Sequence, residues 1–138
     1  MAIYHLHANI ISRAKGRSAV AAAAYRAGEK IHNYSDGITH DYTRKSGVVH
    51  TEILLPENAS KEYFDRLTLW NAVEKSEKRK DSQTARDLDI ALPVELNLDE
   101  QIDLMREYIS ENFVSKGMCA DFAIHDKCRV HLKDTHYR

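Results

Sequence analysis

The pattern of apolar and polar positions predicts strands alternating with helices. Residues 3–11 alternate between apolar and polar side chains, which is typical of a strand with one buried face. The same alternation predicts strands over residues 86–92 and 118–125. A β-prone apolar run over residues 48–55 predicts a further strand, which ends at Pro56 because proline cannot continue the ladder.

Three segments have the spacing of helices. Ser18 is a favourable N-cap for an alanine-rich helix over residues 19–27, and Gly28 is suited to end it. A second helix is predicted to begin near Ser60, and a third to run from about residue 99 to residue 116. The apolar stripes consist of Phe64, Leu67, Trp70 and Val73 in the second helix and Ile102, Met105, Ile109 and Phe113 in the third.

The order of these elements predicts the fold class. The segment 33–47 is polar and rich in turn residues, so we expect a long exposed loop there. The whole order favours an α/β or α+β sandwich, with a mainly antiparallel sheet and helices packed on it. The 138 residues are expected to form a single domain over positions 1–138, with residues 127–138 as an atypical tail.

Composition excludes several classes of protein. Hydrophobic residues make up 43% and charged residues 30% of the chain, which is typical of a soluble globular protein. No apolar run approaches the roughly 20 residues of a membrane helix. The first residues lack the pattern of a secretory signal, and two cysteines do not form a disulfide framework. We therefore expect a cytoplasmic protein without membrane insertion.

Charge is distributed unevenly although the formal net charge is only −1. Residues 13–45 contain seven basic and three acidic side chains, whereas residues 95–111 contain six acidic and one basic. Contacts to phosphate need a local group of Lys and Arg, so the basic segment is compatible with nucleic-acid binding. Two solvated faces of opposite sign are the alternative interpretation.

Tyr25 is the first candidate for chemistry. It lies in the predicted alanine-rich helix, where small neighbours leave room for a nucleic-acid strand, and Arg26 beside it is suited to bind a phosphate. A tyrosine in this place is also compatible with an aromatic anchor that packs the helix on the sheet. The residues alone leave both interpretations open.

Carboxylates and histidines are the second group of candidates. Asp87 and Asp89 share one face of their predicted strand, where they could orient a metal-binding imidazole or simply form a polar outer face. His125 ends the strand 118–125, and His131 and His136 follow it. His131 and His136 are five positions apart, so a regular strand would point them to opposite faces.

Seven segments together resemble a known family. They are Ala2–His5, Ser18–Glu29, Asp41–Lys45, Glu52–Pro56, Leu69–Glu74, Ala85–Leu96 and Asp121–Asp126. In order and spacing they resemble the N-terminal part of the MobA/MobL family, the relaxases that nick plasmid DNA at a transfer origin. The resemblance covers about the first 127 positions.

The resemblance implies a mechanism and a fold of the relaxase type. It places the nucleophile on Tyr25, which would attack the scissile phosphate and give a 5′-phosphotyrosyl enzyme and a free 3′-hydroxyl. It implies a three-histidine site for a divalent metal, magnesium or manganese, whose first histidine is His125. The acidic residue beside that site in the family corresponds to Asp87.

The function expected from the resemblance is a relaxase-type DNA strand transferase and site-specific single-strand endonuclease in the conjugative mobilisation of plasmids. Its partners would be single-stranded or hairpin DNA at the transfer origin and accessory mobilisation proteins. The phosphate contacts expected on this basis come from Arg13, Lys15, Arg17 and Arg26.

The chain departs from the family pattern after His125. The family continues into Asn-Pro-His-x-His, whereas this chain reads Lys127-Cys-Arg-Val-His-Leu-Lys-Asp-Thr-His-Tyr-Arg138, the ending expected of a truncated or frameshifted gene. His131 and His136 are the only substitutes for the missing metal ligands, so we expect weak or absent binding of manganese or magnesium. The alternatives are a catalytically silent DNA-binding remnant and an unrelated α/β interaction domain.

Overall fold

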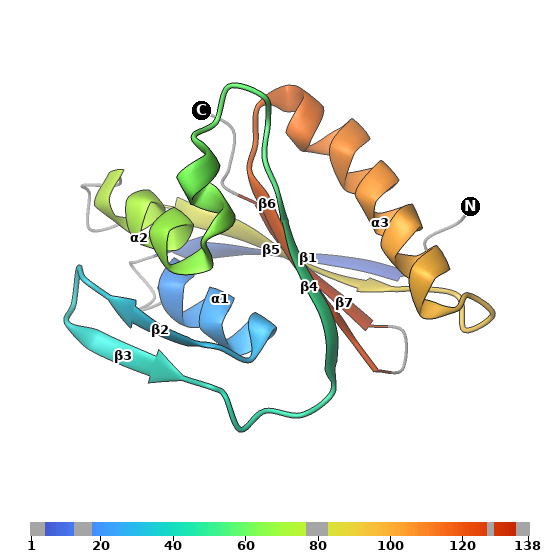
Figure 1. Ribbon diagram of the computed structural model, residues 1–138, viewed down its shortest axis with the longest axis horizontal. Helices are drawn as coiled ribbons and strands as arrows, with labels where there is room; N and C mark the ends of the chain where they lie inside the picture. The colour runs from blue at the N-terminus through green and yellow to red at the C-terminus, as the bar shows by residue number, and fades with distance from the viewer. Residues whose placement is uncertain (1–4, 13–17, 77–82, 127–128, 135–138) are drawn as a thin grey trace.

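A strongly twisted antiparallel sheet forms the centre of the computed structural model, which describes residues 5–12, 18–76, 83–126 and 129–134 (Figure 1). The sheet has five strands in the order β1-β5-β7-β6-β4, and every neighbouring pair is antiparallel. The predicted fold class is therefore confirmed. The strands are β1 His5–Ser12, β4 Val48–Leu54, β5 Gln83–Ala91, β6 Ala120–His125 and β7 Arg129–Asp134.

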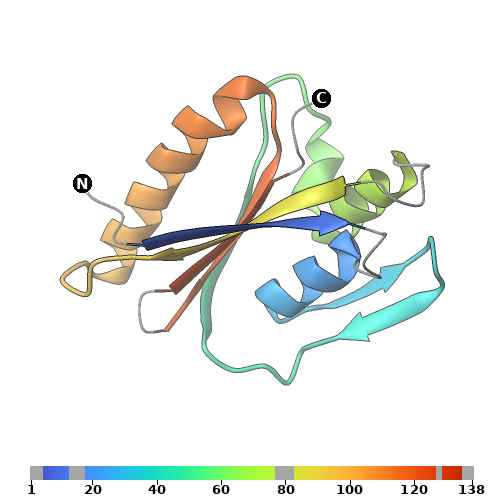
Figure 2. The same cartoon turned by 180° about the vertical axis from the view of Figure 1, so that it is seen from behind.

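Helices cover both faces of this sheet. Figures 1 and 2 show α3 on one side of the strands and α1 and α2 on the other. The α-helices are α1 Ala19–Ala27, α2 Arg66–Ser76 and α3 Leu98–Asn112, and short 3₁₀ turns precede α2 at Lys61–Phe64 and follow α3 at Val114–Lys116. α1 matches its predicted range and α3 begins within one residue of its predicted start, whereas α2 begins at Arg66 and not near Ser60. The predicted second helix is divided at Asp65, whose backbone is extended.

The face beneath α3 has an apolar centre, with the Arg86–Asp134 and Arg106–Glu52 ion pairs at its margins. Even-numbered residues of β5, β6 and β7 point to it, since cross-strand partners share a face. Met105, Ile109 and Phe113 of α3 and the residues next to it close this core. The strand residues in the cluster are Leu88, Ile90, Ala120, Phe122, Ile124, Val130 and Leu132. Burial of this cluster stabilises the sheet.

The opposite face is apolar at one end and polar at the other. Beneath α1 and α2, strand residues such as Ile11, Ile53 and Ala85 pack against Val20 and Trp70 in a second core. Farther along the same strands, beyond the C-terminal end of α1, the register places Asp87, Asp89, His125 and His131 on this face. The polar end of this face is where the candidate chemistry lies.

Local signals fix the ends of α1. Ser18 accepts a hydrogen bond from the Ala21 N–H, and the buried carboxylate of Glu74 accepts one from the Ala19 N–H at 2.7 Å. These bonds satisfy donors that the first turn of a helix leaves unpaired. Gly28 ends the helix in the left-handed conformation, with φ at 68°. Tyr25 and Arg26 are therefore held in the last turn.

Two segments differ from the sequence predictions. Residues 33–47 are not a continuous loop, because β2 Lys30–Asn33 and β3 Ile38–Asp41 form a two-stranded hairpin. The turn is made by a left-handed Gly37 and by Asp36, which accepts a hydrogen bond from the Ile38 N–H. The sequence also predicts no strand after residue 125, whereas β7 lies in the sheet between β5 and β6. Within the described residues, no helix is long and apolar enough to cross a membrane.

Candidate active site

Tyr25 stands exposed at the C-terminal end of α1, with 45% of its surface accessible. Its ring makes a T-shaped contact with the ring of Tyr42, at a centroid distance of 5.2 Å and an interplanar angle of 87°. The Lys45 Nζ atom lies 4.0 Å from the ring centroid and donates a hydrogen bond of 2.8 Å to the Tyr25 carbonyl. Tyr25 is therefore not the buried anchor of the alternative interpretation.

Arg26 fastens this turn of α1 to the sheet. Its Nη2 donates to Asp87 Oδ2 at 2.5 Å, and the side chain of Asp87 is almost fully buried. A buried carboxylate needs such a partner, because desolvation makes an unpaired charge costly. The guanidinium expected to bind phosphate is thus already paired with the carboxylate that the resemblance places beside the metal.

His125 and His131 come together through the β6–β7 hairpin. His125 pairs with Arg129 across the hairpin, and His131 pairs with Ala123, so all four residues share one face. The two imidazole rings meet edge to face with their centroids 4.4 Å apart. His125 Nε2 lies 3.2 Å from the Arg26 carbonyl, which only accepts, so this nitrogen carries the proton of that bond.

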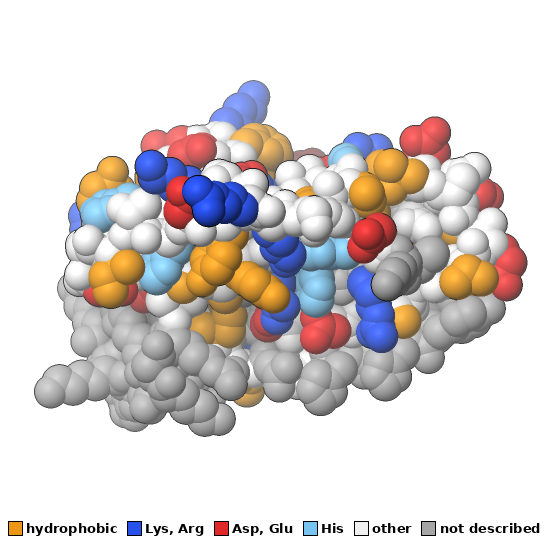
Figure 3. Space-filling view, turned by 90° about the horizontal axis from the view of Figure 1, so that it is seen from below, with side chains coloured by type: hydrophobic (Ala, Val, Ile, Leu, Met, Phe, Trp, Pro, Cys, Tyr) orange, Lys and Arg blue, Asp and Glu red, His pale blue; other side chains and the backbone are white. Residues whose placement is uncertain are grey.

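Asp89 orients the second histidine. The residue pairs with His131 across β5 and β7, and its Oδ1 contacts His131 Nδ1 at a short hydrogen-bond distance. A carboxylate on Nδ1 fixes the ring and leaves Nε2 as the other nitrogen. In Figure 3, Lys and Arg, His, and Asp and Glu side chains gather beside one another in the middle of one face of the molecule.

The electrostatics keep both imidazoles neutral. Burial, together with the positive charges of Lys45 and Arg26 and the neighbouring His131, lowers the pKa of His125 to about 4. Burial and Arg26 also lower the pKa of His131, although the carboxylate of Asp89 opposes the shift. Burial and Arg26 lower the pKa of Lys45 as well. Neutral imidazoles offer lone pairs to a proton or a metal ion at neutral pH.

The described residues do not provide the three-imidazole site that the resemblance implies. No group of three or more His, Cys, Asp or Glu side chains among them is placed to hold a metal ion. Asp87 and Asp89 are engaged by Arg26 and His131, and the position across from His125 is Arg129. His136, the other substitute ligand, lies outside the described residues.

Asp121 belongs to a separate buried cluster although it shares a strand face with His125. It accepts two hydrogen bonds from Arg66, at 2.6 and 2.7 Å, and one of 2.9 Å from the Trp70 indole. Arg66 Nη1 also donates to Glu29 at 2.5 Å. The cluster joins α2, β6 and the residue that follows the end of α1, so it holds the frame around Tyr25.

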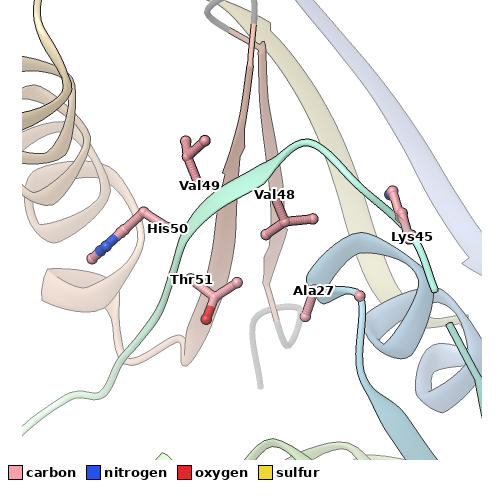
Figure 4. Close-up of a pocket in the computed structure, with 7 residues that line it drawn as sticks. Ala27, Lys45, Val48, Val49, His50 and Thr51 are labelled. Carbon is pink, nitrogen blue, oxygen red and sulfur yellow. The ribbon is translucent and has the colours of Figure 1, made fainter. Parts of the chain in front are cut away.

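An open hollow lies beside Tyr25, between the end of α1 and β4. Its volume is about 380 Å³, and it is lined by Ala27, Gly28, Lys45, Val48, Val49, His50 and Thr51. Figure 4 shows Lys45 and Val48 next to the end of α1, whereas His50 extends to the other side of β4. The stem of Lys45 thus connects this hollow to the ring of Tyr25.

The five predicted site residues that the structure describes lie near one another. Arg26, Asp87, His125 and His131 form one polar cluster with Tyr25 at its edge, while Arg13, Lys15 and Arg17 lie outside the described residues. Sequence reasoning missed the contacts of Lys45 and Tyr42 with Tyr25. The Asp41–Lys45 segment carried the resemblance, but nothing in its spacing showed that it packs against α1.

Comparison with known proteins assigns the family. Residues 17–137 match the MobA/MobL family, and this protein belongs to that family. It is 46% identical to the mobilization protein MobL of Acidithiobacillus ferridurans, over 91% of this chain and 32% of MobL. It is 41% identical to the conjugal transfer protein TraA of Rhizobium radiobacter, over 98% of this chain and 14% of TraA. The chain therefore spans about a seventh to a third of these two relatives.

The fold also matches a solved structure, "Molecular Basis of Vancomycin Resistance Transfer in Staphylococcus aureus". The TM-score is 0.90 and the sequence identity is 36%, over 97% of this chain and 70% of that chain. Because the match extends over nearly the whole chain, the sheet order and the helix layers described above are those of an existing fold.

Proposed function

We propose that this chain carries the DNA-nicking centre of a conjugative mobilisation relaxase, with Tyr25 as the nucleophile. The observation that supports the proposal most directly is the anchoring of Arg26, the residue next to Tyr25. Its carbonyl is bonded to His125 and its guanidinium to Asp87, so the exposed phenol is held at the edge of the histidine and carboxylate cluster. Family membership and the structural match support the same function.

In the proposed reaction Tyr25 Oη attacks a DNA phosphodiester. The new bond joins Oη to phosphorus, the bond to the 3′ oxygen breaks, and the phenol proton passes to a base while the 3′ oxygen takes one up. The phosphotyrosyl bond keeps the energy of the broken ester, so the strand can be rejoined later. The substrate would be single-stranded or hairpin DNA at a transfer origin, with accessory mobilisation proteins as partners.

Covalent capture of DNA tests this proposal. The chain would be incubated with a labelled pool of single-stranded oligonucleotides of randomised sequence and manganese, and adducts separated on a denaturing gel. We expect an adduct that Tyr25→Phe abolishes while DNA binding stays nearly intact. Tyr34→Phe is the matched control, because Tyr34 is also exposed but lies in the β2–β3 turn. An adduct that persists in Tyr25→Phe would assign the nucleophile to another residue.

Metal binding distinguishes an active nicking enzyme from a catalytically silent DNA-binding remnant. We propose that manganese or magnesium binds weakly to this chain, because His125 Nε2 is engaged by the Arg26 carbonyl and Arg129 faces His125 across the hairpin. Titration calorimetry with manganese should give weak or undetectable heats. Tight one-to-one binding that disappears in His131→Ala or His136→Ala would contradict this expectation and support a complete site.

A further inference from the structure

We propose that Lys45 is a positioning residue for Tyr25, which fixes the phenol ring and stabilises the negative charge that the ring gains as its hydroxyl attacks phosphorus. This inference rests on the proposed function, since it assigns Lys45 a role in the reaction of Tyr25. Lys45 lies outside the histidine and carboxylate cluster, so the inference adds a further residue to the proposed DNA-nicking centre.

Two contacts place the ammonium group of Lys45 on Tyr25. Nζ lies 4.0 Å from the ring centroid, within the range of a cation–π interaction, and donates to the Tyr25 carbonyl at 2.8 Å. The backbone contact and the ring contact come from one side chain, so they fix the cation relative to the phenol. Tyr42 makes a T-shaped contact with the same ring.

The segment that carries Lys45 is packed tightly against the end of α1. The Tyr42 N–H donates to the Glu29 carbonyl at 3.1 Å, and the Lys45 N–H donates to the Tyr42 carbonyl at 3.0 Å. A Cβ atom on Gly28 would lie 3.9 Å from Lys45 Cβ and 3.7 Å from the Tyr42 carbonyl oxygen. These hydrogen bonds and contacts place the Lys45 backbone beside the end of α1.

Among the described residues, Lys45 is the cation best suited to this role. Arg26 Cζ is 5.5 Å from the same ring, but its guanidinium is paired with Asp87. Within the described part of the chain, no ion pair places a carboxylate on Lys45. The ammonium group of Lys45 is half-buried, and this burial lowers the pKa of Lys45. The fold therefore keeps a charged group here against a desolvation cost.

The contact is stronger in the transition state than before it. A neutral phenol attracts the ammonium group only through the quadrupole of its ring. When the hydroxyl proton leaves, the oxygen shares its negative charge with the ring, and the attraction becomes one between opposite charges. An interaction that grows along the reaction accelerates it, whereas uniform binding does not. In the reverse reaction the phenolate is the leaving group, so the same contact assists rejoining.

The experiment uses single-stranded oligonucleotides of randomised sequence that carry a 5′-p-nitrophenyl phosphate. Attack by Tyr25 forms the bond from Oη to phosphorus and releases p-nitrophenolate, which is measured by absorbance in a buffer containing manganese. Lys45→Met removes the charge but keeps the stem, Lys45→Arg keeps the charge, and Lys30→Met is the matched control on the exposed start of β2. Unfolding curves verify that each variant folds, and Lys45→Gln replaces Lys45→Met if that variant is unstable.

We expect Lys45→Met to lower the rate at saturating DNA about ten-fold, and Lys45→Arg to restore most of it. The half-saturating DNA concentration and the salt dependence of binding should stay unchanged, because the ammonium group is occupied by Tyr25. A salt slope reduced by about 0.7 would make Lys45 a phosphate contact and overturn the proposal. It would also be overturned by an unchanged rate, or by a Lys45→Arg variant as slow as Lys45→Met. If the complete chain releases no p-nitrophenolate through Tyr25, the proposed function itself fails.

Discussion

At the scale of single residues, the strand face that carries His125 also contains a carboxylate with a different role. Asp121 is four residues before His125, so the alternation of β6 puts both on one face. Asp121 lies under α2, where Arg66 and Trp70 donate to both of its oxygens, while His125 lies against the last turn of α1. One face of β6 therefore holds a structural ion pair beneath α2 and a candidate site residue at the end of α1.

The Arg66–Asp121 pair provides a prediction on stability. Asp121→Ala would leave the buried Arg66 guanidinium without its bidentate partner, and breaking a buried pair in this way costs roughly 3–5 kcal/mol. Arg106→Ala is the control, because the Arg106–Glu52 pair on the other face is half-exposed on its Arg106 side and should cost less than about 1 kcal/mol. Urea unfolding followed by circular dichroism would measure both losses. Equal, small losses would show that the cluster does not hold the frame.

At the scale of elements, Gly47 joins the β3–β4 connection to the β6–β7 hairpin. Its φ is 91°, and its carbonyl accepts a hydrogen bond of 2.8 Å from the Asp126 N–H. A Cβ atom at this position would lie only 3.0 Å from Asp126 Oδ1. Glycine is required here for two reasons, the left-handed backbone and the close approach of Asp126 at the end of β6.

Gly37 allows these two reasons to be separated. It has a φ of 74°, and no atom lies within 4 Å of the Cβ that alanine would add. Gly37→Ala should therefore cost only the backbone term, about 1–2 kcal/mol. Gly47→Ala should cost more, because Asp126 must also move away. The urea midpoints of the two variants give the comparison, and a Gly47→Ala variant no less stable than Gly37→Ala would show that Asp126 moves freely.

At the scale of the whole molecule, sequence periodicity predicted the strands and helices that are determined by residues close together in the chain. The alternation of residues 86–92 and the cap at Ser18 gave a strand and a helix close to those observed. The hairpin of β2 and β3 was missed because its strands have four residues each, with only one isoleucine in each strand. At the site, the residue pattern made Tyr25 and His125 candidates and the family resemblance supplied their expected roles. The contact of Lys45 with Tyr25 depends on tertiary packing that sequence spacing does not reveal.

β7 has a consequence for how the protein is made. It bonds to β5 on one side and to β6 on the other, yet it is the last of the described strands to be synthesised. While the ribosome is still adding it, β5 and β6 each have an unpaired edge, and such edges pair readily with other chains. The nascent chain therefore cannot close its sheet gradually from the N-terminus. The two halves of the sheet, β1 with β5 and β4 with β6, are joined only when β7 has been made.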